Sequence, residues 1–181
     1  MREATYSYGK NLFSMEQIKE INLQINKSFI SGSDLPALTA KKTSNVKFLM
    51  LGSVQRLIIP FLQYCQEANN TSFGFDLFQL SSQKILNYNI YETGTEYSWH
   101  VDAESRSPIR DIKLTCLLNL SEGPFEGGDL YLFKGGEVKC KEFREPGSAV
   151  VFPSFTNHRV EKLTSGNRAT LAIWMHGPKF R

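Results

Sequence analysis

The sequence predicts a mainly β protein, a sandwich or barrel of short strands with flanking helices. Three observations support this fold class. Short apolar runs separated by turn residues dominate the chain after residue 73. Two stretches before it have the periodicity of amphipathic helices, and 41% apolar residues in a chain of 181 suffice for a sizeable core. We therefore expect a single domain over residues 1–181, with helical support in 1–72 and the β core in 73–178.

The first predicted helix begins after Ser14. Ser14 can cap it together with Gln17, since a serine followed three residues later by glutamine forms a capping box. Ile18, Ile21 and Ile25 then fall on one face at helical spacing. This face is expected to pack on a sheet.

A second amphipathic helix is predicted over 53–69, after a polar, turn-rich loop at 30–45. Pro60 lies inside this range and predicts either a kink or a helix start at that residue. The inner face would carry four small or apolar side chains, Leu57, Phe61, Cys65 and Ala68.

The rest of the chain reads as strands bounded by turn residues. The expected strands are 73–80, 84–91, 97–101, 112–120, 129–133, 137–143, 148–152, 158–162 and 168–175. Alternation in 84–91 places three apolar side chains on one face and Asn87, Asn89 and Tyr91 on the other. The polar face either meets solvent or lines a pocket.

His100 and Asp102 are the first candidate site residues. Their spacing puts both side chains on one face of an extended strand. An imidazole and a carboxylate make two-thirds of the 2-His-1-carboxylate triad that holds non-haem Fe(II) and leaves three coordination positions open. The same pair also fits two ordinary surface residues. Because the chain has three histidines, the third ligand of such a triad is His158 or His176.

His158 follows an apolar run that reads as a buried strand. A turn at 164–167 would form a hairpin that returns Arg168 near this imidazole. Arg168, Thr170, Ala172 and Trp174 then share one face. A guanidinium and a hydroxyl on that face suit a carboxylate ligand. We expect His176 to point away from that face, as a surface or edge histidine.

Together these residues resemble the Fe(II)/2-oxoglutarate-dependent dioxygenases, and further segments resemble the prolyl 4-hydroxylase-like branch. The segments are Tyr91-x-x-Gly94-x-x-Tyr97-x-x-His100-x-Asp102, Pro124 to Phe133, and Val151 to Val160 followed by Gly166-Asn-Arg168. The resemblance covers residues 83–178. It implies a double-stranded β-helix, or jelly roll, with the N-terminal helices packed on one sheet.

The resemblance also implies a function. His100, Asp102 and His158 would hold Fe(II), and 2-oxoglutarate would place its distal carboxylate on Arg168. Dioxygen would be consumed, succinate and CO₂ released, and a C–H bond of a prolyl or other amino-acid-like substrate hydroxylated. Ascorbate binding is implied as well.

The resemblance places further residues near the co-substrate. Tyr91 is expected to contact 2-oxoglutarate. Asn119 stands where related enzymes carry a tyrosine that binds the distal carboxylate, so an amide there leaves more of that task to Arg168 and Thr170. The polar loop 103–111 is either an inert connection or a substrate lid.

Charge and composition narrow the alternatives. A net charge of +3 is too small for the basic stripe of a nucleic-acid binder, and Lys41, Lys42, Lys139 and Lys141 are scattered. Three cysteines without metal-type spacing predict reduced thiols and a cytoplasmic protein. The apolar stretch 48–62 is too interrupted to span a bilayer.

Two other functions stay open: a jelly-roll binding protein without turnover, and an oxygenase acting on nucleic-acid bases. A small-molecule or peptidyl substrate is expected, and the oligomeric state is unassigned.

Overall fold

Two antiparallel sheets form the centre of the molecule. The structure is a computed structural model that describes residues 5–30, 35–36, 42–103 and 107–180. Lys41 and positions 104–106 of the predicted loop 103–111 lie outside these ranges. The larger sheet contains β1 (Ser7–Gly9), β2 (Leu35–Pro36), β3 (Asn45–Met50), β4 (Ile85–Glu92), β6 (Arg110–Asn119), β7 (Phe125–Gly127), β10 (Ala149–Pro153) and β12 (Leu163–Pro178). The smaller sheet contains β5 (Tyr97–His100), β8 (Leu130–Phe133), β9 (Glu137–Lys139) and β11 (His158–Val160).

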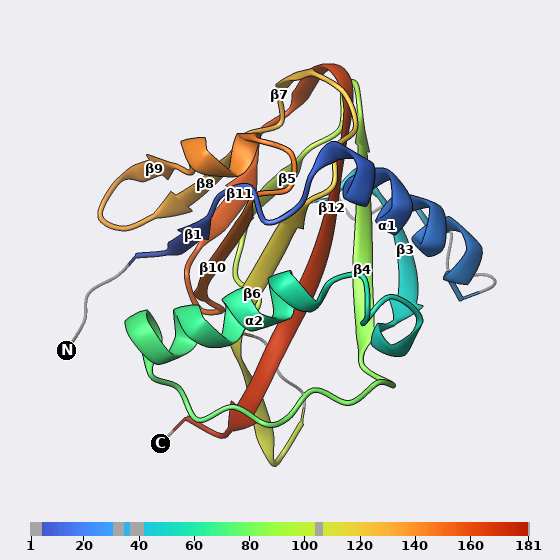
Figure 1. The fold of residues 1–181 in the computed structure, drawn as a ribbon. Coiled ribbons are helices and arrows are strands. Elements are labelled where there is room, and N and C mark those ends of the chain that lie inside the picture. The colour runs from blue at the N-terminus through green and yellow to red at the C-terminus, as the bar shows by residue number, and fades with distance from the viewer. Residues whose placement is uncertain (1–4, 31–34, 37–41, 104–106, 181) are drawn as a thin grey trace.

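The strand order is that of a jelly roll. In the larger sheet it is β1-β10-β6-β12-β4-β3-β2, with β7 beside β12, and in the smaller sheet it is β5-β11-β8-β9. Two α-helices, α1 (Met15–Ser28) and α2 (Ile59–Ala68), cover the outer face of the larger sheet (Figure 1). Short helical turns lie at η1 (Leu51–Ser53), η2 (Asn69–Phe73) and η3 (Lys141–Arg144). The predicted mainly β jelly roll with helices on one sheet is confirmed.

Helix α1 has the predicted cap. The Ser14 hydroxyl accepts a hydrogen bond from the Gln17 backbone N–H at 3.3 Å, and the Gln17 side chain accepts one from the Ser14 N–H at 2.9 Å. Each side chain thus satisfies a donor that has no partner inside the helix. Ile18, Ile21 and Ile25 are buried against the sheet, as the spacing predicted.

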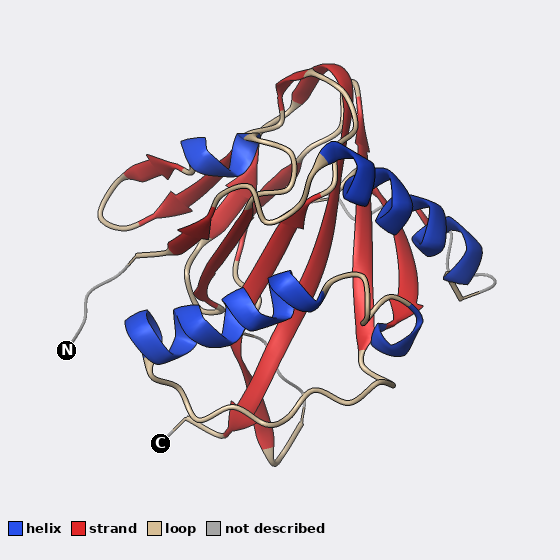
Figure 2. Cartoon of the chain, viewed as in Figure 1, coloured by secondary structure: helices blue, strands red, loops and turns tan. Residues whose placement is uncertain are grey.

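Helix α2 begins at Ile59, with Pro60 in its first turn. Of the two alternatives at Pro60, the helix start is therefore the correct one, because a first-turn residue needs no intrahelical N–H donor. Phe61, Cys65 and Ala68 are buried beneath the helix. Figure 2 shows both helices lying across the strands of the same sheet.

Four strands were not predicted from the sequence. β1, β2, β3 and β7 all belong to the larger sheet, so the segment before residue 73, including the predicted loop 30–45, contributes strands as well as helices. β3 pairs with β4 along its length, from Asn45 opposite Ile90 to Met50 opposite Ile85. No hydrophobic alternation marks β3, because Lys47 and Phe48 are both half-buried.

The strand predicted at 73–80 is wrong. Phe75 and Leu77 pack partly buried against the core beneath the helices, which produces an alternating pattern. The chain between η2 and β4 is nevertheless irregular. The Phe78 N–H donates to the His176 carbonyl at 2.8 Å, but the segment does not continue into a ladder.

The hairpin predicted between His158 and Arg168 is also wrong. β11 pairs with β5 and β8 in the smaller sheet, whereas β12 pairs with β4, β6 and β7 in the larger one. The expected turn at 164–167 is part of β12, where Gly166 lies opposite Phe125 of β7. The strand predicted at 137–143 ends at Lys139 and is followed by η3.

Alternation along β12 divides the interior into two cores. Leu171, Ile173 and Met175 face the helices. Arg168, Thr170, Ala172 and Trp174 face the space between the sheets, where they line one cavity, as predicted. None of the described helices combines the length and apolar character needed to cross a bilayer.

Candidate functional site

Three side chains converge between the sheets. His100 ends β5, Asp102 follows it by two residues, and His158 begins β11 directly opposite His100 in the register. Nε2 of His100 lies 3.7 Å from Oδ1 of Asp102, and Nε2 of His158 lies 3.6 Å from Oδ2. One ligand atom from each residue falls within 4.8 Å of the others, so the three could hold a single metal ion.

Backbone carbonyls determine which nitrogen of each imidazole faces the position that a metal ion would occupy. Nδ1 of His100 lies 2.7 Å from the Ser98 carbonyl, and Nδ1 of His158 lies 3.0 Å from the Thr156 carbonyl. A carbonyl only accepts, so each bond requires the proton on Nδ1. Nε2 of both rings then keeps its lone pair for a metal, as in ligating histidines held by outer hydrogen bonds.

Burial keeps both imidazoles uncharged. It lowers the pKa of His100 to about 4, an effect to which the neighbouring His158 adds. Burial also lowers the pKa of His158. Near neutral pH both rings are in the unprotonated form that a metal requires.

The carboxylate of Asp102 is held by two donors. The Trp174 indole Nε1–H donates to Oδ2 at 2.9 Å and the Thr115 hydroxyl donates to the same oxygen at 2.8 Å. The Tyr97 ring stacks on His100 with its centroid 3.5 Å away. Thr115 was not predicted as a site residue, although alternation along β6 places it on the inner face, opposite Trp174 of β12.

Arg168 is suited to bind an anion. Its side chain is only 2% exposed, and its guanidinium lies 5.1 Å from the Tyr91 ring centre and 5.4 Å from that of Phe143. Nη1 is buried with no hydrogen-bond partner among the described residues. A buried donor without a partner is costly, and a carboxylate in this cavity would satisfy it. Tyr91 and Thr170 line the same cavity, on the strands where they were expected.

Asn119 lies outside the lining of this cavity. It is fully buried, its amide donates to the carbonyls of Phe143 and Arg144 at 2.9 and 3.0 Å, and its oxygen accepts from the Ser121 N–H. These bonds use both amide hydrogens. The expected co-substrate contact of Asn119 is therefore not supported, because the side chain holds η3 and the end of β6 in place.

Lys42 lines the cavity and was missed as a site residue. Its Nζ donates to Oδ1 of Asn89 at 2.7 Å and lies 4.9 Å from the Tyr97 ring centre. Burial lowers its pKa to about 8. The cavity has a volume of about 40 Å³, room for a few waters at most. A larger ligand therefore requires side chains such as Lys42 to move.

His176 is placed differently from the prediction. It lines the same pocket as Trp174, because residues two apart on a strand share a face. The expectation that it points away from Trp174 is wrong. It is nevertheless separate from the three clustered groups, which include His158 as the second histidine.

Comparison with known proteins agrees with this geometry. Residues 86–176 match the model of the 2OG-Fe(II) oxygenase superfamily. A PKHD-type hydroxylase of Synechococcus sp. (strain CC9605) is 44% identical over 84 residues, which cover 45% of this chain and 37% of the relative. A PKHD-type hydroxylase of Synechococcus sp. (strain JA-2-3B'a(2-13)) is 26% identical over 176 residues, 91% of this chain and 75% of the relative. The chain spans less than half the length of the first curated relatives that it matches.

Solved structures share the fold. A prolyl-4-hydroxylase of Pseudomonas putida superposes with a TM-score of 0.75 at 19% identity, covering 98% of this chain and 95% of that one. A viral collagen prolyl hydroxylase from Paramecium Bursaria Chlorella virus-1, in its 2OG complex, gives 0.73 at 17% identity, with 97% of each chain covered. With half of its residues matched by the family model and the triad in place, this chain belongs to the 2OG-Fe(II) oxygenase superfamily.

Proposed function

We propose that this protein is an Fe(II)- and 2-oxoglutarate-dependent hydroxylase of the prolyl 4-hydroxylase-like branch. The observation that carries the proposal is the convergence of His100, Asp102 and His158 beside the buried guanidinium of Arg168. Two neutral imidazoles and one carboxylate are the donor set of a facial triad, which suits Fe(II). The unpartnered Nη1 of Arg168 fits an anionic co-substrate.

The chain's own residues would each have a defined task. His100, Asp102 and His158 would hold Fe(II), while Trp174 and Thr115 keep the carboxylate oriented. Fe(II) would supply the oxidative chemistry that converts dioxygen and 2-oxoglutarate to succinate and CO₂ with hydroxylation of a C–H bond.

The co-substrate would be held from the other end of the cavity. Arg168 would bind its distal carboxylate, with Thr170 and Tyr91 beside it. The apolar wall formed by Leu117, Val160 and Ala172 would exclude water around these groups.

The proposed substrate is a small molecule or a peptide with an amino-acid-like C–H bond. A nucleic-acid substrate has little support from the placement of the lysines. Lys42 is inside the cavity, and Lys139 forms an ion pair with Asp129 at 2.5 Å, so neither adds to a basic groove of the kind that binds single strands. All three cysteines are buried and unpaired, which supports a reducing compartment such as the cytoplasm.

Succinate formation tests the proposal. The Fe(II)-loaded protein is incubated with labelled 2-oxoglutarate and a mixture of small molecules and peptides, while mass spectrometry searches for products heavier by one oxygen. Succinate should appear with the wild type and be lost in His100→Ala and Asp102→Ala. Asp76→Ala, which changes an exposed acid, is the matched control. Succinate formation with and without added ascorbate tests whether the predicted ascorbate binding affects the reaction.

Binding of the co-substrate is tested separately. With Mn(II) in place of Fe(II), 2-oxoglutarate should raise the melting temperature of the wild type, because a ligand that binds only the folded state stabilises it. Arg168→Gln should abolish this increase and Arg168→Lys should keep part of it. An equal increase in Arg168→Gln would remove Arg168 from the proposed site.

A further inference from the structure

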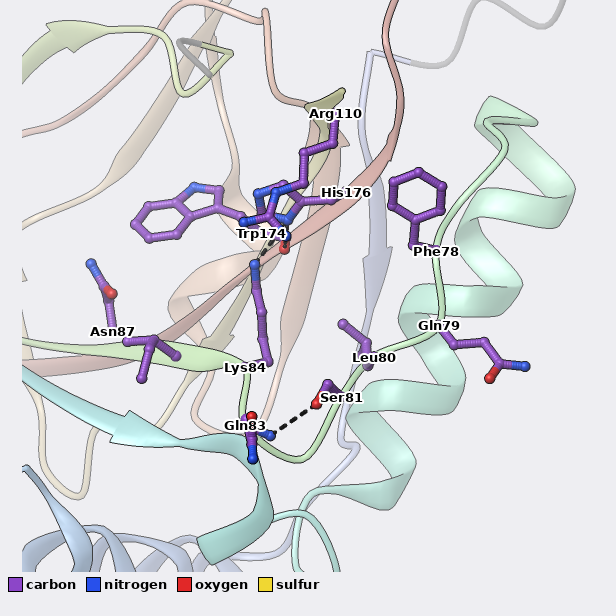
Figure 3. Close-up of a pocket in the computed structure, with 11 residues that line it drawn as sticks. Phe78, Gln79, Leu80, Ser81, Gln83, Lys84, Asn87, Arg110, Trp174 and His176 are labelled. Carbon is purple, nitrogen blue, oxygen red and sulfur yellow. Dashed lines mark hydrogen bonds between the residues drawn. The ribbon is translucent and has the colours of Figure 1, made fainter. Parts of the chain in front are cut away.

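A second cavity adjoins the metal-ligand cluster. Its volume is about 450 Å³, within the usual range for small-molecule sites. Figure 3 shows Lys84, Arg110 and His176 gathered on one side of it, together with Trp174. We call this cavity the basic pocket. Among the described residues that line it there is no aspartate or glutamate.

The basic pocket and the cavity of the triad lie along the same two strands, β4 and β12. On β4, Asn87 lines the basic pocket, while Asn89, two residues further, lines the cavity of the triad. On β12 the corresponding residues are His176 and Ala172, with Trp174 lining both. A strand advances about 3.4 Å per residue, so His176 is only about 7 Å along β12 from Trp174.

Trp174 is the wall between the two spaces. Its indole N–H donates to Asp102, and the ring borders the basic pocket. A molecule held in the basic pocket would therefore lie next to a metal bound by Asp102.

Lys84 has donors that an acidic partner could use. Lys84 Nζ lies 2.9 Å from Nδ1 of His176. An ammonium has three donors, and at most one of them is directed at Nδ1 of His176, which also lies 3.1 Å from the Trp174 carbonyl. Burial, and then the charge of Arg110, lower the pKa of Lys84 to about 8. Burial, and then the charge of Lys84, lower the pKa of His176 to about 4. The neighbours of these groups thus add positive charge, which a bound anion would offset.

We propose that the basic pocket binds a carboxylate of the substrate through Lys84 and Arg110, and so selects an acidic, amino-acid-sized unit for hydroxylation. The proposal rests on the proposed function, since it names the substrate class of that site. Gln83 and Asn87 offer amides for further hydrogen bonds, while Leu80, Ile85 and Trp174 provide apolar surface for the carbon skeleton.

Ligand binding can be measured without turnover. The chain has two tryptophans, so its two indole N–H signals in ¹⁵N spectra are assigned with Trp99→Phe. Addition of N-acetyl-L-glutamate to the metal-free protein should shift the Trp174 signal, while N-acetyl-L-glutamine should not. A glutamate flanked by neutral residues in a short peptide then shows whether the unit is recognised free or within a chain.

Matched variants identify the groups responsible. Lys84→Met and Arg110→Gln should each weaken N-acetyl-L-glutamate binding by at least about tenfold, the effect of losing a charge-assisted hydrogen bond. Lys19→Met removes the same charge from an exposed position on α1 and should leave the affinity unchanged. Arg168→Gln should also leave it unchanged, which excludes binding of the probe at the co-substrate end of the cavity. Melting temperatures confirm that each variant folds.

Three results would overturn the proposal. They are equal binding of the neutral glutamine compound, unchanged affinity in Lys84→Met and Arg110→Gln, or binding of inorganic phosphate with no binding of the carboxylate. The oxygenase assignment fails independently, through absence of succinate in the wild type. If the probe binds as expected but no succinate forms, the basic pocket stands and the proposed reaction does not.

Discussion

The Trp174 indole donates its N–H to Oδ2 of Asp102 across 2.9 Å, joining β12 of the larger sheet to the residue that follows β5 of the smaller one. Thr115 of β6 donates to the same oxygen at 2.8 Å. Oδ1 receives neither of these bonds, so its lone pairs stay available to a metal. The larger sheet thus orients the only carboxylate in the described metal-ligand cluster.

Loss of the indole donor should weaken metal binding. Trp174→Phe keeps an aromatic ring but removes the N–H, so we expect Mn(II) affinity to fall about 10- to 100-fold, the usual effect of removing an outer hydrogen bond from a ligand. Isothermal titration calorimetry measures it. Trp99→Phe, which removes the other indole, is the control and should bind Mn(II) like the wild type. An unchanged affinity in Trp174→Phe would mean that Thr115 alone orients Asp102.

Metal binding should release less than half a proton at pH 6.5. Two histidines with the ordinary pKa near 6.5 would together release about one proton on binding at that pH, half from each. Burial and the mutual effect of the rings lower the pKa of His100 to about 4, and burial lowers that of His158. His100 is therefore already unprotonated at pH 6.5, and fewer than half of the His158 rings carry a proton. Calorimetry of Mn(II) binding in buffers of different ionisation enthalpy gives the number directly.

The lowered histidine pKa values determine the pH range in which Mn(II) affinity changes. A lowered pKa means that the folded state resists protonation, so the loss of Mn(II) affinity through His100 should come only as the pH approaches 4, below the range near 6.5 where an ordinary histidine would cause it. Release of about one proton at pH 6.5 would show that the rings titrate normally and are more exposed to water than the structure indicates.

Local patterns in the sequence predicted the parts of the fold that depend on local chemistry. The Ser14 cap, the face formed by Ile18, Ile21 and Ile25, and the shared face of Arg168 and Thr170 all follow from spacing along the chain. Pairing between distant segments is not encoded in spacing. The prediction that His158 and Arg168 lie in one hairpin was wrong for that reason. The sequence of a short strand does not identify the strand with which it pairs.

Lys42 shows the same limit within the site. It follows a segment of turn-forming composition and reaches the cavity because the chain there bridges to Tyr97 and leads into β3. No motif marks it. The wrong prediction for His176 has a different cause. His176 and Trp174 are two residues apart on one strand, so alternation already predicted that they share a face.

The buried ammonium of Lys42 should make stability depend on pH. Its pKa is lowered to about 8 in the folded protein, against about 10.4 in an unfolded chain. Between these values the unfolded state binds more protons, so unfolding free energy should rise with pH across this window. Lys42→Met has no ammonium at this position, so its unfolding free energy should lack this pH dependence. The wild type should therefore gain on the order of 2 kcal/mol relative to Lys42→Met between pH 7 and 10.5.

Urea unfolding of both proteins at the two pH values measures this difference. Lys19→Met, at an exposed position, serves as the control and should follow the wild type throughout. A constant gap between wild type and Lys42→Met would contradict the buried placement of the ammonium.

Asn119 and Thr170 lie opposite one another in the register of β6 and β12, and substitution should separate their roles. Asn119→Ala leaves two carbonyls and the Ser121 N–H without their partner, so it should lower the unfolding free energy by roughly 3 kcal/mol. The increase in melting temperature caused by 2-oxoglutarate should persist in this variant, because Asn119 lies outside the cavity. Thr170→Val should do the reverse, since its hydroxyl lines the cavity: near-normal stability with a smaller response to 2-oxoglutarate. A lost response in Asn119→Ala at temperatures where it is folded would instead restore Asn119 to the co-substrate site.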